Sequence, residues 1–210
     1  MKSLKMNMSV RFVLFAVFAA VTLAAPLSII WKYENTLRHG TLFKFRTQPV
    51  DPVDAFRGRY VTLSFADDFV ADGGRTDKWA TNNEPGGILY VRLKNDAQGF
   101  AVPVESSRKR LSGDDVVTVT DAYRHRDGWR FDYPFDRYYL PEDVAPMAEQ
   151  LYREANRGAR SRDGAKVDTY VAVRVRNGVG VIEELYLNGA PVREAVRAEM
   201  QRRGKVNDSR

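Results

Sequence analysis

The most constraining feature of this chain is a run of twenty uncharged, mostly apolar residues near its N-terminus, residues 12–31. As an α-helix, this run (FVLFAVFAAVTLAAPLSIIW) extends about 30 Å, the thickness of the hydrocarbon core of a bilayer. Arg11 precedes it and Trp31, Lys32 and Tyr33 end it, and residues of these types favour the headgroup layers. The sequence therefore predicts a transmembrane helix over residues 12–31.

A cleaved signal peptide is the alternative interpretation of this run. The apolar core of such a peptide usually spans about 7 to 15 residues and ends at small residues. The segment Leu23-Ala24-Ala25 before Pro26 matches a cleavage site poorly, and the apolar run continues beyond it. We therefore favour an uncleaved anchor.

The orientation of this anchor is not decided by charge, because similar numbers of basic residues lie on its two sides. A short basic N-terminus tends to stay in the cytoplasm, and long domains are translocated largely regardless of charge. We expect residues 1–11 in the cytoplasm and the remainder outside it. The protein would then cross the membrane once.

Composition excludes several classes of function. The chain has no cysteine and two histidines, which removes disulfides, thiolate nucleophiles and almost every zinc site. We expect no metal and no cofactor.

The formal net charge of +6 is confined to residues 1–31 and 191–210. Because a nucleic-acid surface needs clustered Lys and Arg, nucleic acid is not an expected partner.

Residues 32–190 have the pattern of one extracytoplasmic β-rich domain. Alternating apolar runs flank turn residues, and Asn-Gly and Asp-Gly are strong indicators of hairpins. The expected pairs are residues 88–94 with 100–105, 116–125 with 129–133, and 170–176 with 179–187. The predicted fold class is mainly β (α+β), with antiparallel hairpins and one packed amphipathic helix after the transmembrane helix.

That amphipathic helix is predicted over residues 141–155, where Val144, Ala148, Leu151 and Ala155 share one face. A second, weaker helix begins at Pro191 and ends near residue 200, and a polar basic tail follows to residue 210.

Three other segments complete the prediction. Residues 32–50 form a juxtamembrane segment that leads into a first strand, and residues 60–65 form a strand with Val61, Leu63 and Phe65 on its buried face. Residues 67–87 form a long loop. Two five-residue segments, VRLKN at 91–95 and VRVRN at 173–177, also resemble each other. Either duplication of a half-domain or chance recurrence explains this similarity.

Residues 51–65, DPVDAFRGRYVTLSF, resemble the signature of the bacterial GDYXXLXY family of membrane-anchored proteins. The run RYYLPE at 137–142 and the hairpin at 180–189 are also similar to that family. Arg59 replaces the Asp of the family name and Phe65 its final Tyr. The resemblance implies an N-terminal anchor, an extracytoplasmic domain and association with a multi-pass membrane protein. It implies no catalytic residue.

Candidate binding residues come from two segments. In the first, Asp54 and Gly58 fit a turn that Arg57 braces, and the functional hypothesis is a polar edge that binds a partner's carboxylate. In the second, tyrosine and arginine suit a protein interface, although core packing and a first helical turn at Glu142 are the favoured explanation. The candidates are Asp54, Arg57, Gly58, Arg59, Tyr60, Arg137, Tyr138, Tyr139 and Glu142.

The sequence contains no motif of an activated nucleophile or general base, so no catalytic residue is predicted. We expect a non-catalytic accessory subunit of a multi-pass membrane protein. The alternative is a binder or sensor of small cell-envelope ligands, with residues 67–87 as a lid. A serine-lysine hydrolase that uses Ser64, Ser106 or Ser107 is the less favoured third hypothesis.

Overall fold

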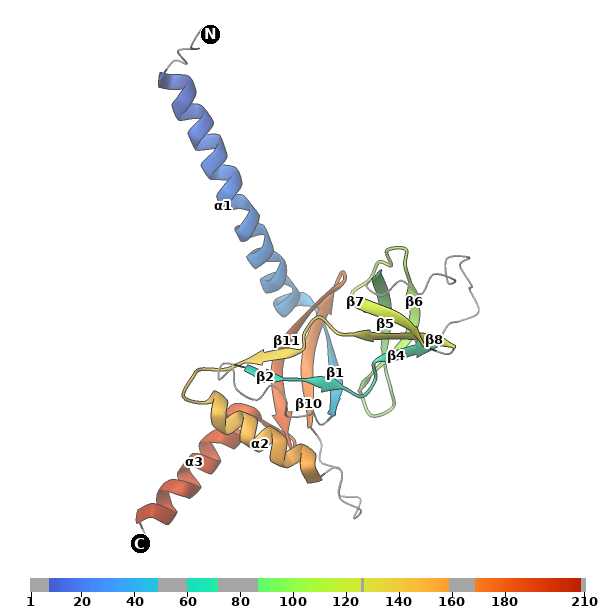
Figure 1. Cartoon of the computed structure of the whole chain (residues 1–210), viewed down its shortest axis with the longest axis vertical. Coiled ribbons are helices and arrows are strands. Elements are labelled where there is room, and N and C mark those ends of the chain that lie inside the picture. The colour runs from blue at the N-terminus through green and yellow to red at the C-terminus, as the bar shows by residue number, and fades with distance from the viewer. Residues whose placement is uncertain (1–7, 49–59, 72–86, 126, 159–168, 209–210) are drawn as a thin grey trace.

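The computed structural model describes residues 8–48, 60–71, 87–125, 127–158 and 169–208. Its first element, α1 (Met8–His39), projects away from the rest of the protein (Figure 1). Among the described residues it is the one helix long and apolar enough to cross a membrane, and none of its apolar window is buried. The prediction of an apolar helix is confirmed. Its extent was underestimated, because residues 32–39 continue the helix instead of forming an extended segment.

The junction between α1 and the first strand is tightly packed. The Gly40 amide donates to the Thr36 carbonyl oxygen at 2.8 Å, and Arg174 Nη1 donates to the Gly40 carbonyl oxygen at 3.2 Å. A Cβ atom at Gly40 would lie 2.5 Å from the Thr36 carbonyl oxygen and 3.0 Å from that of Val175. Only glycine fits between these backbone atoms, so α1 is held directly against the sheet that follows it.

The sheet joined to α1, here called the proximal sheet, has the strand order β12-β11-β10-β1-β3. Strand β1 (Thr41–Gln48) pairs antiparallel with β10 (Thr169–Arg176), from Thr41 opposite Val175 to Arg46 opposite Tyr170. The other members are β3 (Ser64–Phe65), β11 (Val179–Leu187) and β12 (Ala190–Pro191).

The second five-stranded sheet, here called the distal sheet, has the order β4-β8-β7-β5-β6. Its strands are β4 (Phe69–Ala71), β5 (Gly87–Asn95), β6 (Ala101–Ser107), β7 (Val116–His125) and β8 (Gly128–Asp132). The two sheets meet where the Thr118 amide donates to the Gly178 carbonyl oxygen and the Gly178 amide donates to that of Val116, both at 2.9 Å.

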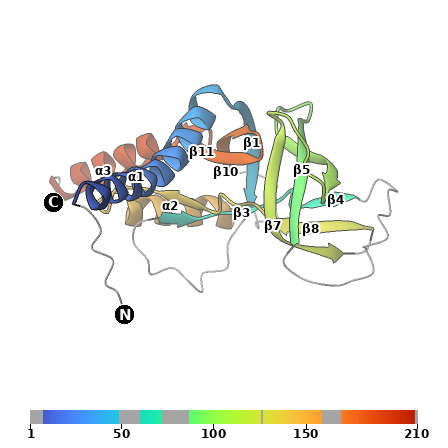
Figure 2. The same ribbon diagram turned by 90° about the horizontal axis from the view of Figure 1, so that it is seen from above.

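Two long antiparallel segments, residues 60–71 and 128–139, run along both sheets and are called the bridging ribbon here. At one end β2 (Tyr60–Thr62) pairs with β9 (Arg137–Tyr139), and at the other β4 pairs with β8. Between them the Leu63 amide donates to the Asp136 carbonyl oxygen at 2.8 Å. Figures 1 and 2 show the ribbon crossing from the helical end of the molecule to the distal sheet.

An aromatic cluster lies beneath the bridging ribbon. The ring of Phe45 on β1 lies 5.0 Å from that of Tyr133 and 5.1 Å from that of Phe135, and Phe65 lies 5.2 Å from Tyr133 (centroid distances). These four side chains are at most 6% exposed. The ribbon is therefore fixed to the proximal sheet by apolar and edge-to-face aromatic contacts.

Two helices pack at the end of the proximal sheet opposite to α1. Helix α2 (Ala145–Gly158) buries Ala145, Ala148 and Tyr152, and the Tyr152 hydroxyl donates to the Gln48 carbonyl oxygen at 3.3 Å. Helix α3 (Val192–Asp208) buries Val192 and Val196.

The three predicted hairpins and the mainly β fold class are confirmed. The predicted strand at 60–65 is divided at Leu63, because β2 pairs with β9 and β3 pairs with β1. Helix α2 begins four residues later than predicted, after a turn in which the Ala145 amide donates to the Pro141 carbonyl oxygen. The predicted tail is wrong as far as Asp208, because α3 continues to that residue.

Candidate functional site

The predicted binding residues divide into two groups in the structure. Asp54, Arg57, Gly58 and Arg59 lie outside the described residues, as does the predicted turn around them. The described candidates are Tyr60, Arg137, Tyr138, Tyr139 and Glu142.

The sequence left open whether the two candidate segments meet, and in the structure they are paired strands. Tyr60 lies opposite Tyr139, Val61 opposite Tyr138 and Thr62 opposite Arg137 in the β2–β9 ladder. Because side chains alternate across a strand, Tyr60, Arg137 and Tyr139 share the outer face, and Val61 and Tyr138 share the inner one.

The outer face carries a preformed cluster of two tyrosines and one arginine, here called the Tyr-Arg cluster. The ring centroids of Tyr60 and Tyr139 lie 5.6 Å apart, and the Arg137 guanidinium carbon lies 5.2 Å from the Tyr60 centroid. Hydrogen bonding to Tyr139 and the charge of Asp136 raise the pKa of Arg137 above its ordinary value, so the arginine stays charged. Tyr139 is 64% exposed. The cluster thus presents aromatic area and a fixed positive charge to solvent.

The inner face holds this cluster in place through Tyr138. Its side chain is 7% exposed, and its hydroxyl donates to Glu184 Oε1 on β11 at 2.6 Å. Burial, followed by the hydrogen bond to Glu184, raises the pKa of Tyr138 to about 12. Tyr138 is therefore a neutral hydrogen-bond donor that ties β9 to the proximal sheet, and little of its side chain is exposed.

Glu142, the remaining described candidate, is exposed and lies in the turn that leads into α2. Because α2 begins at Ala145, Glu142 precedes the first helical turn instead of lying within it.

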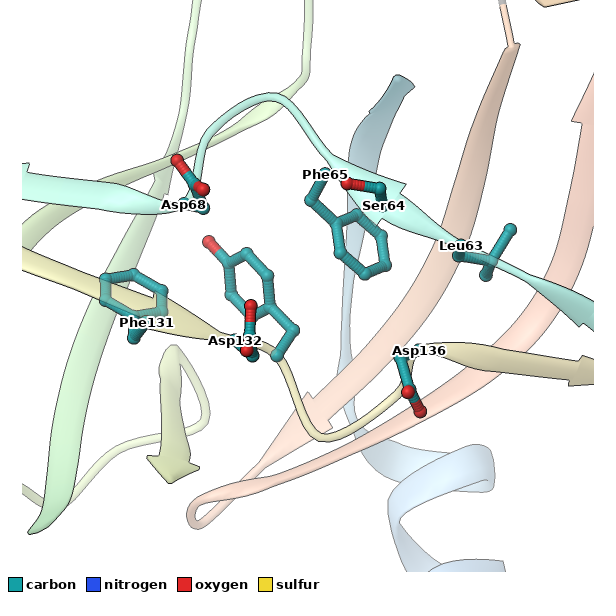
Figure 3. A pocket seen from close by; sticks show the side chains of 8 residues that line it. Leu63, Ser64, Phe65, Asp68, Phe131, Asp132 and Asp136 are labelled. Atoms are coloured by element: carbon teal, nitrogen blue, oxygen red, sulfur yellow. The ribbon is translucent and has the colours of Figure 1, made fainter. Parts of the chain in front are cut away.

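Farther along the bridging ribbon lies a pocket of about 220 Å³ that sequence reasoning missed (Figure 3). Its polar side chains are Ser64 and Asp68 from one segment of the ribbon and Asp132 and Asp136 from the other. The alternation of the buried residues Phe131, Tyr133 and Phe135 could have placed Asp132 and Asp136 on the outer face. Their approach to Asp68 depends on pairing between distant segments, which no local pattern predicts.

Burial controls the protonation of two groups at this pocket. The pKa of Asp68 is raised mainly by burial, against the lowering effect of Arg130, whose Nη2 lies 3.4 Å away. Burial also raises the pKa of Tyr133, and its hydroxyl donates to the Asp67 carbonyl oxygen at 2.9 Å. The pocket is thus an acidic hollow with a neutral phenol at its floor.

Ser64, a serine of the serine-lysine hypothesis, lies at this pocket. Ser64 lines the pocket, but none of the described lining residues is a lysine or histidine that could take its proton. In the part of the chain that the structure describes, no group of three His, Asp or Glu residues is placed to hold a metal ion.

The structure also explains two residues of the family-like signature. Leu63 is 4% exposed and Phe65 is 6% exposed, and both lie on the inner face of the ribbon. Phe65 makes edge contacts with Phe45, Tyr133 and Phe135. Phenylalanine therefore satisfies this aromatic position by ring packing alone.

In a comparison with protein families, residues 22–185 match a family model described as "GDYXXLXY protein". This range runs from the second half of α1 to β11 and includes the whole bridging ribbon. Comparisons with curated proteins and with solved structures found no match.

Proposed function

This chain belongs to the GDYXXLXY protein family, and from that premise we propose that it is a membrane-anchored accessory subunit. In this proposal α1 spans a bacterial inner membrane once, and the β-rich domain lies outside the cytoplasm. The Tyr-Arg cluster of the bridging ribbon binds a multi-pass membrane protein. No catalytic step is assigned to the chain.

The continuity of α1 supports the anchor. The helix runs through Ala25 and Pro26 to His39. Its apolar run of twenty residues exceeds the roughly 7 to 15 that are usual in a signal peptide. Proline is tolerated inside membrane helices because neighbouring groups and local adjustments satisfy the freed carbonyl. The close packing at Gly40 then fixes the domain to the anchor, so that a partner in the same membrane meets it in one orientation.

The observation that carries the proposal is the Tyr-Arg cluster. Tyrosine and arginine are enriched among residues that dominate binding energy at protein interfaces. Here the two rings and the guanidinium already contact one another in the free protein. Less side-chain entropy is therefore lost on binding than for three independent flexible side chains.

Small-ligand binding is the alternative, and the pocket on the bridging ribbon is what favours it. Its volume of about 220 Å³ is below the range of about 300–1,000 Å³ that is typical of ligand pockets. A pocket of this size suits a single side chain better than a glycan or lipid fragment. The predicted lid falls mostly outside the described residues. Saturable thermal stabilisation by a glycan or lipid fragment would favour this alternative.

The experiment is purification of the full-length protein from native membranes in mild detergent through a C-terminal tag. We expect a multi-pass membrane protein in stoichiometric amount. Arg137→Glu and Tyr139→Ala should each reduce its recovery at least about tenfold, a typical loss when an interface anchor is removed. Tyr123→Ala is the control, because Tyr123 is an exposed tyrosine (46%) of the distal sheet. Purification of the protein alone, or equal recovery with all three variants, would contradict the proposal.

A further inference from the structure

The connection between β6 and β7 contains a basic segment that the proposed function does not use. Arg108, Lys109 and Arg110 are consecutive and exposed. The Arg108 guanidinium carbon lies 5.1 Å from the centroid of Trp129, which fixes the base of the segment. No described carboxylate lies within ion-pair distance of Lys109 or Arg110.

The nearby acidic residues do not compensate this charge. Asp115 follows the segment, but its carboxylate accepts two hydrogen bonds from Arg92, at 2.7 and 2.8 Å. Asp114 lies 3.8 Å from Arg176 Nε. Each of these carboxylates therefore already faces an arginine of its own, and among the described residues the basic segment keeps a net positive charge.

This basic segment lies at the same end of the domain as the exit of α1. Gly40, the residue that follows α1, packs beside Arg174 and Val175 near the end of β10. Arg176, the last residue of β10, lies near Asp114, and Gly178 of the β10–β11 turn that follows contacts the start of β7. Figure 1 shows the β6–β7 connection and this turn on the side of the domain from which α1 rises. The segment thus faces the direction of the proposed bilayer.

The length of α1 beyond its apolar run sets the distance from that bilayer. Residues 32–39 add about 12 Å of helix between the end of the apolar run and the domain. The headgroup layer fills about 5–8 Å of this distance. The remaining gap is within the reach of a lysine or arginine side chain and shorter than the Debye length of about 8 Å at physiological ionic strength.

We propose that the segment Arg108-Lys109-Arg110 contacts anionic phospholipid headgroups of the membrane in which α1 is anchored. Basic residues next to a membrane segment are attracted to anionic lipid surfaces, and the attraction weakens with salt. With α1 fixed at Gly40, this second contact determines the tilt and rotation of the domain on the membrane. The inference rests on the anchoring role proposed for α1.

The absence of cysteine from the chain allows a test with a single attached fluorophore. Full-length protein labelled at Ser112→Cys, next to the basic segment, is reconstituted into vesicles of phosphatidylcholine alone or mixed equally with phosphatidylglycerol. Both vesicles contain a quencher attached to lipid headgroups. We expect at least about twofold more quenching in the anionic vesicles, and loss of this increase at high salt.

Matched controls separate the contact from general attraction. A label at Ala97→Cys, in the exposed β5–β6 turn at the other end of the distal sheet, should show no increase. Lys109→Glu combined with Arg110→Glu should abolish the increase at position 112, whereas Lys94→Glu should leave it unchanged. Equal quenching in the two kinds of vesicle would overturn the contact, and so would an increase that survives the double reversal.

Flotation of the same vesicles distinguishes the two proposals. Protein that floats with the vesicles and resists alkaline extraction is anchored, so a negative quenching result then contradicts the headgroup contact alone. Protein that is extracted from both kinds of vesicle contradicts the anchor, and the headgroup contact with it.

Discussion

The hairpins β5–β6 and β10–β11 carry the similar segments VRLKN and VRVRN at the end of their first strands, yet they have different surroundings. In each, the arginine binds a glutamate of the second strand: Arg92 Nε lies 2.9 Å from Glu105, and Arg174 Nε lies 2.7 Å from Glu183. Each ladder also has a register shift, within the segment in β5–β6 and at its start in β10–β11. The two hairpins are thus locally alike.

Their further contacts differ. Arg92 binds Asp115 within the distal sheet, whereas Arg174 donates to the Gly40 carbonyl oxygen at the exit of α1. The same local pattern therefore closes a loop in one sheet and holds a helix in the other. Local sequence therefore determines that both hairpins form, and tertiary position determines what their arginines bind.

The largest expected difference between the hairpins lies at their turn glycines. Gly178 and Gly99 both have positive φ, of 88° and 82°. A Cβ at Gly178 would lie 2.5 Å from Thr118 Oγ1 of the distal sheet, whereas none of the described atoms lies within 4 Å of a Cβ at Gly99. Gly99→Ala should lower the free energy of unfolding by about 1–2 kcal/mol from backbone strain. Gly178→Ala should lower it by about 2–4 kcal/mol, because overpacking is added.

Urea denaturation of these two variants measures the comparison. Thr118→Ala in the Gly178→Ala background removes the clashing hydroxyl and should recover part of the loss. Equal destabilisation by the two glycine substitutions would mean that Gly178 is not pressed against the distal sheet.

The two buried tyrosines of the bridging ribbon give the next largest difference. Tyr138 donates to a carboxylate of the proximal sheet, and Tyr133 donates to the Asp67 backbone carbonyl. Hydrogen bonds to charged groups contribute about 1.5–3 kcal/mol and neutral ones about 0.5–1.5 kcal/mol, so Tyr138→Phe should destabilise more than Tyr133→Phe. Thermal unfolding by circular dichroism measures both. If Tyr133→Phe destabilises the protein more than Tyr138→Phe, the hydrogen bond from Tyr138 to Glu184 contributes less than a neutral hydrogen bond.

A smaller effect is expected at the two arginines. Both are partly exposed, and Arg92→Ala and Arg174→Ala should each cost about 1 kcal/mol in the free energy of unfolding. The two substitutions should loosen different segments of the backbone. Arg174→Ala should speed amide exchange in residues 40–43, and Arg92→Ala should speed it in residues 113–117. Exchange that changes at the same residues in both variants would refute the distinct roles.

The smallest effect is a pH dependence at Asp68, on the distal part of the bridging ribbon. Burial raises its pKa above the ordinary value, so folding favours the protonated form. The stability that this group contributes is full at acid pH, below its ordinary pKa, and is lost as the pH rises through the folded pKa. Asp68→Asn should therefore stabilise the protein more near pH 7 than near pH 3. A melting-temperature difference that shrinks as pH rises would show that Arg130 outweighs burial.

The elements predicted from sequence are those with local causes. Asn177-Gly178 specifies a hairpin turn through its own backbone preference, with positive φ at both residues, and the apolar run specifies a helix through its length. The helical extension at residues 32–39 could not be predicted, because it is polar and depends on packing at Gly40.

The candidate site shows the same limit. Tyr60 and Tyr139 were each selected from sequence, but their contact arises from pairing between segments far apart in the chain. The inward position of Tyr138 follows from alternation, whereas its bond to Glu184 requires a third strand. The pocket at Asp68 depends on the same pairing.

Site-specific photocrosslinking in living cells tests the central claim most directly. A photoreactive phenylalanine derivative replaces Tyr139 on the bridging ribbon or, as a control, Tyr123 on the distal sheet; both positions are exposed. The account predicts that position 139 crosslinks to one multi-pass membrane protein and that position 123 does not. Absence of a protein adduct at position 139, or the same adducts from both positions, would contradict the role of the Tyr-Arg cluster as a docking surface.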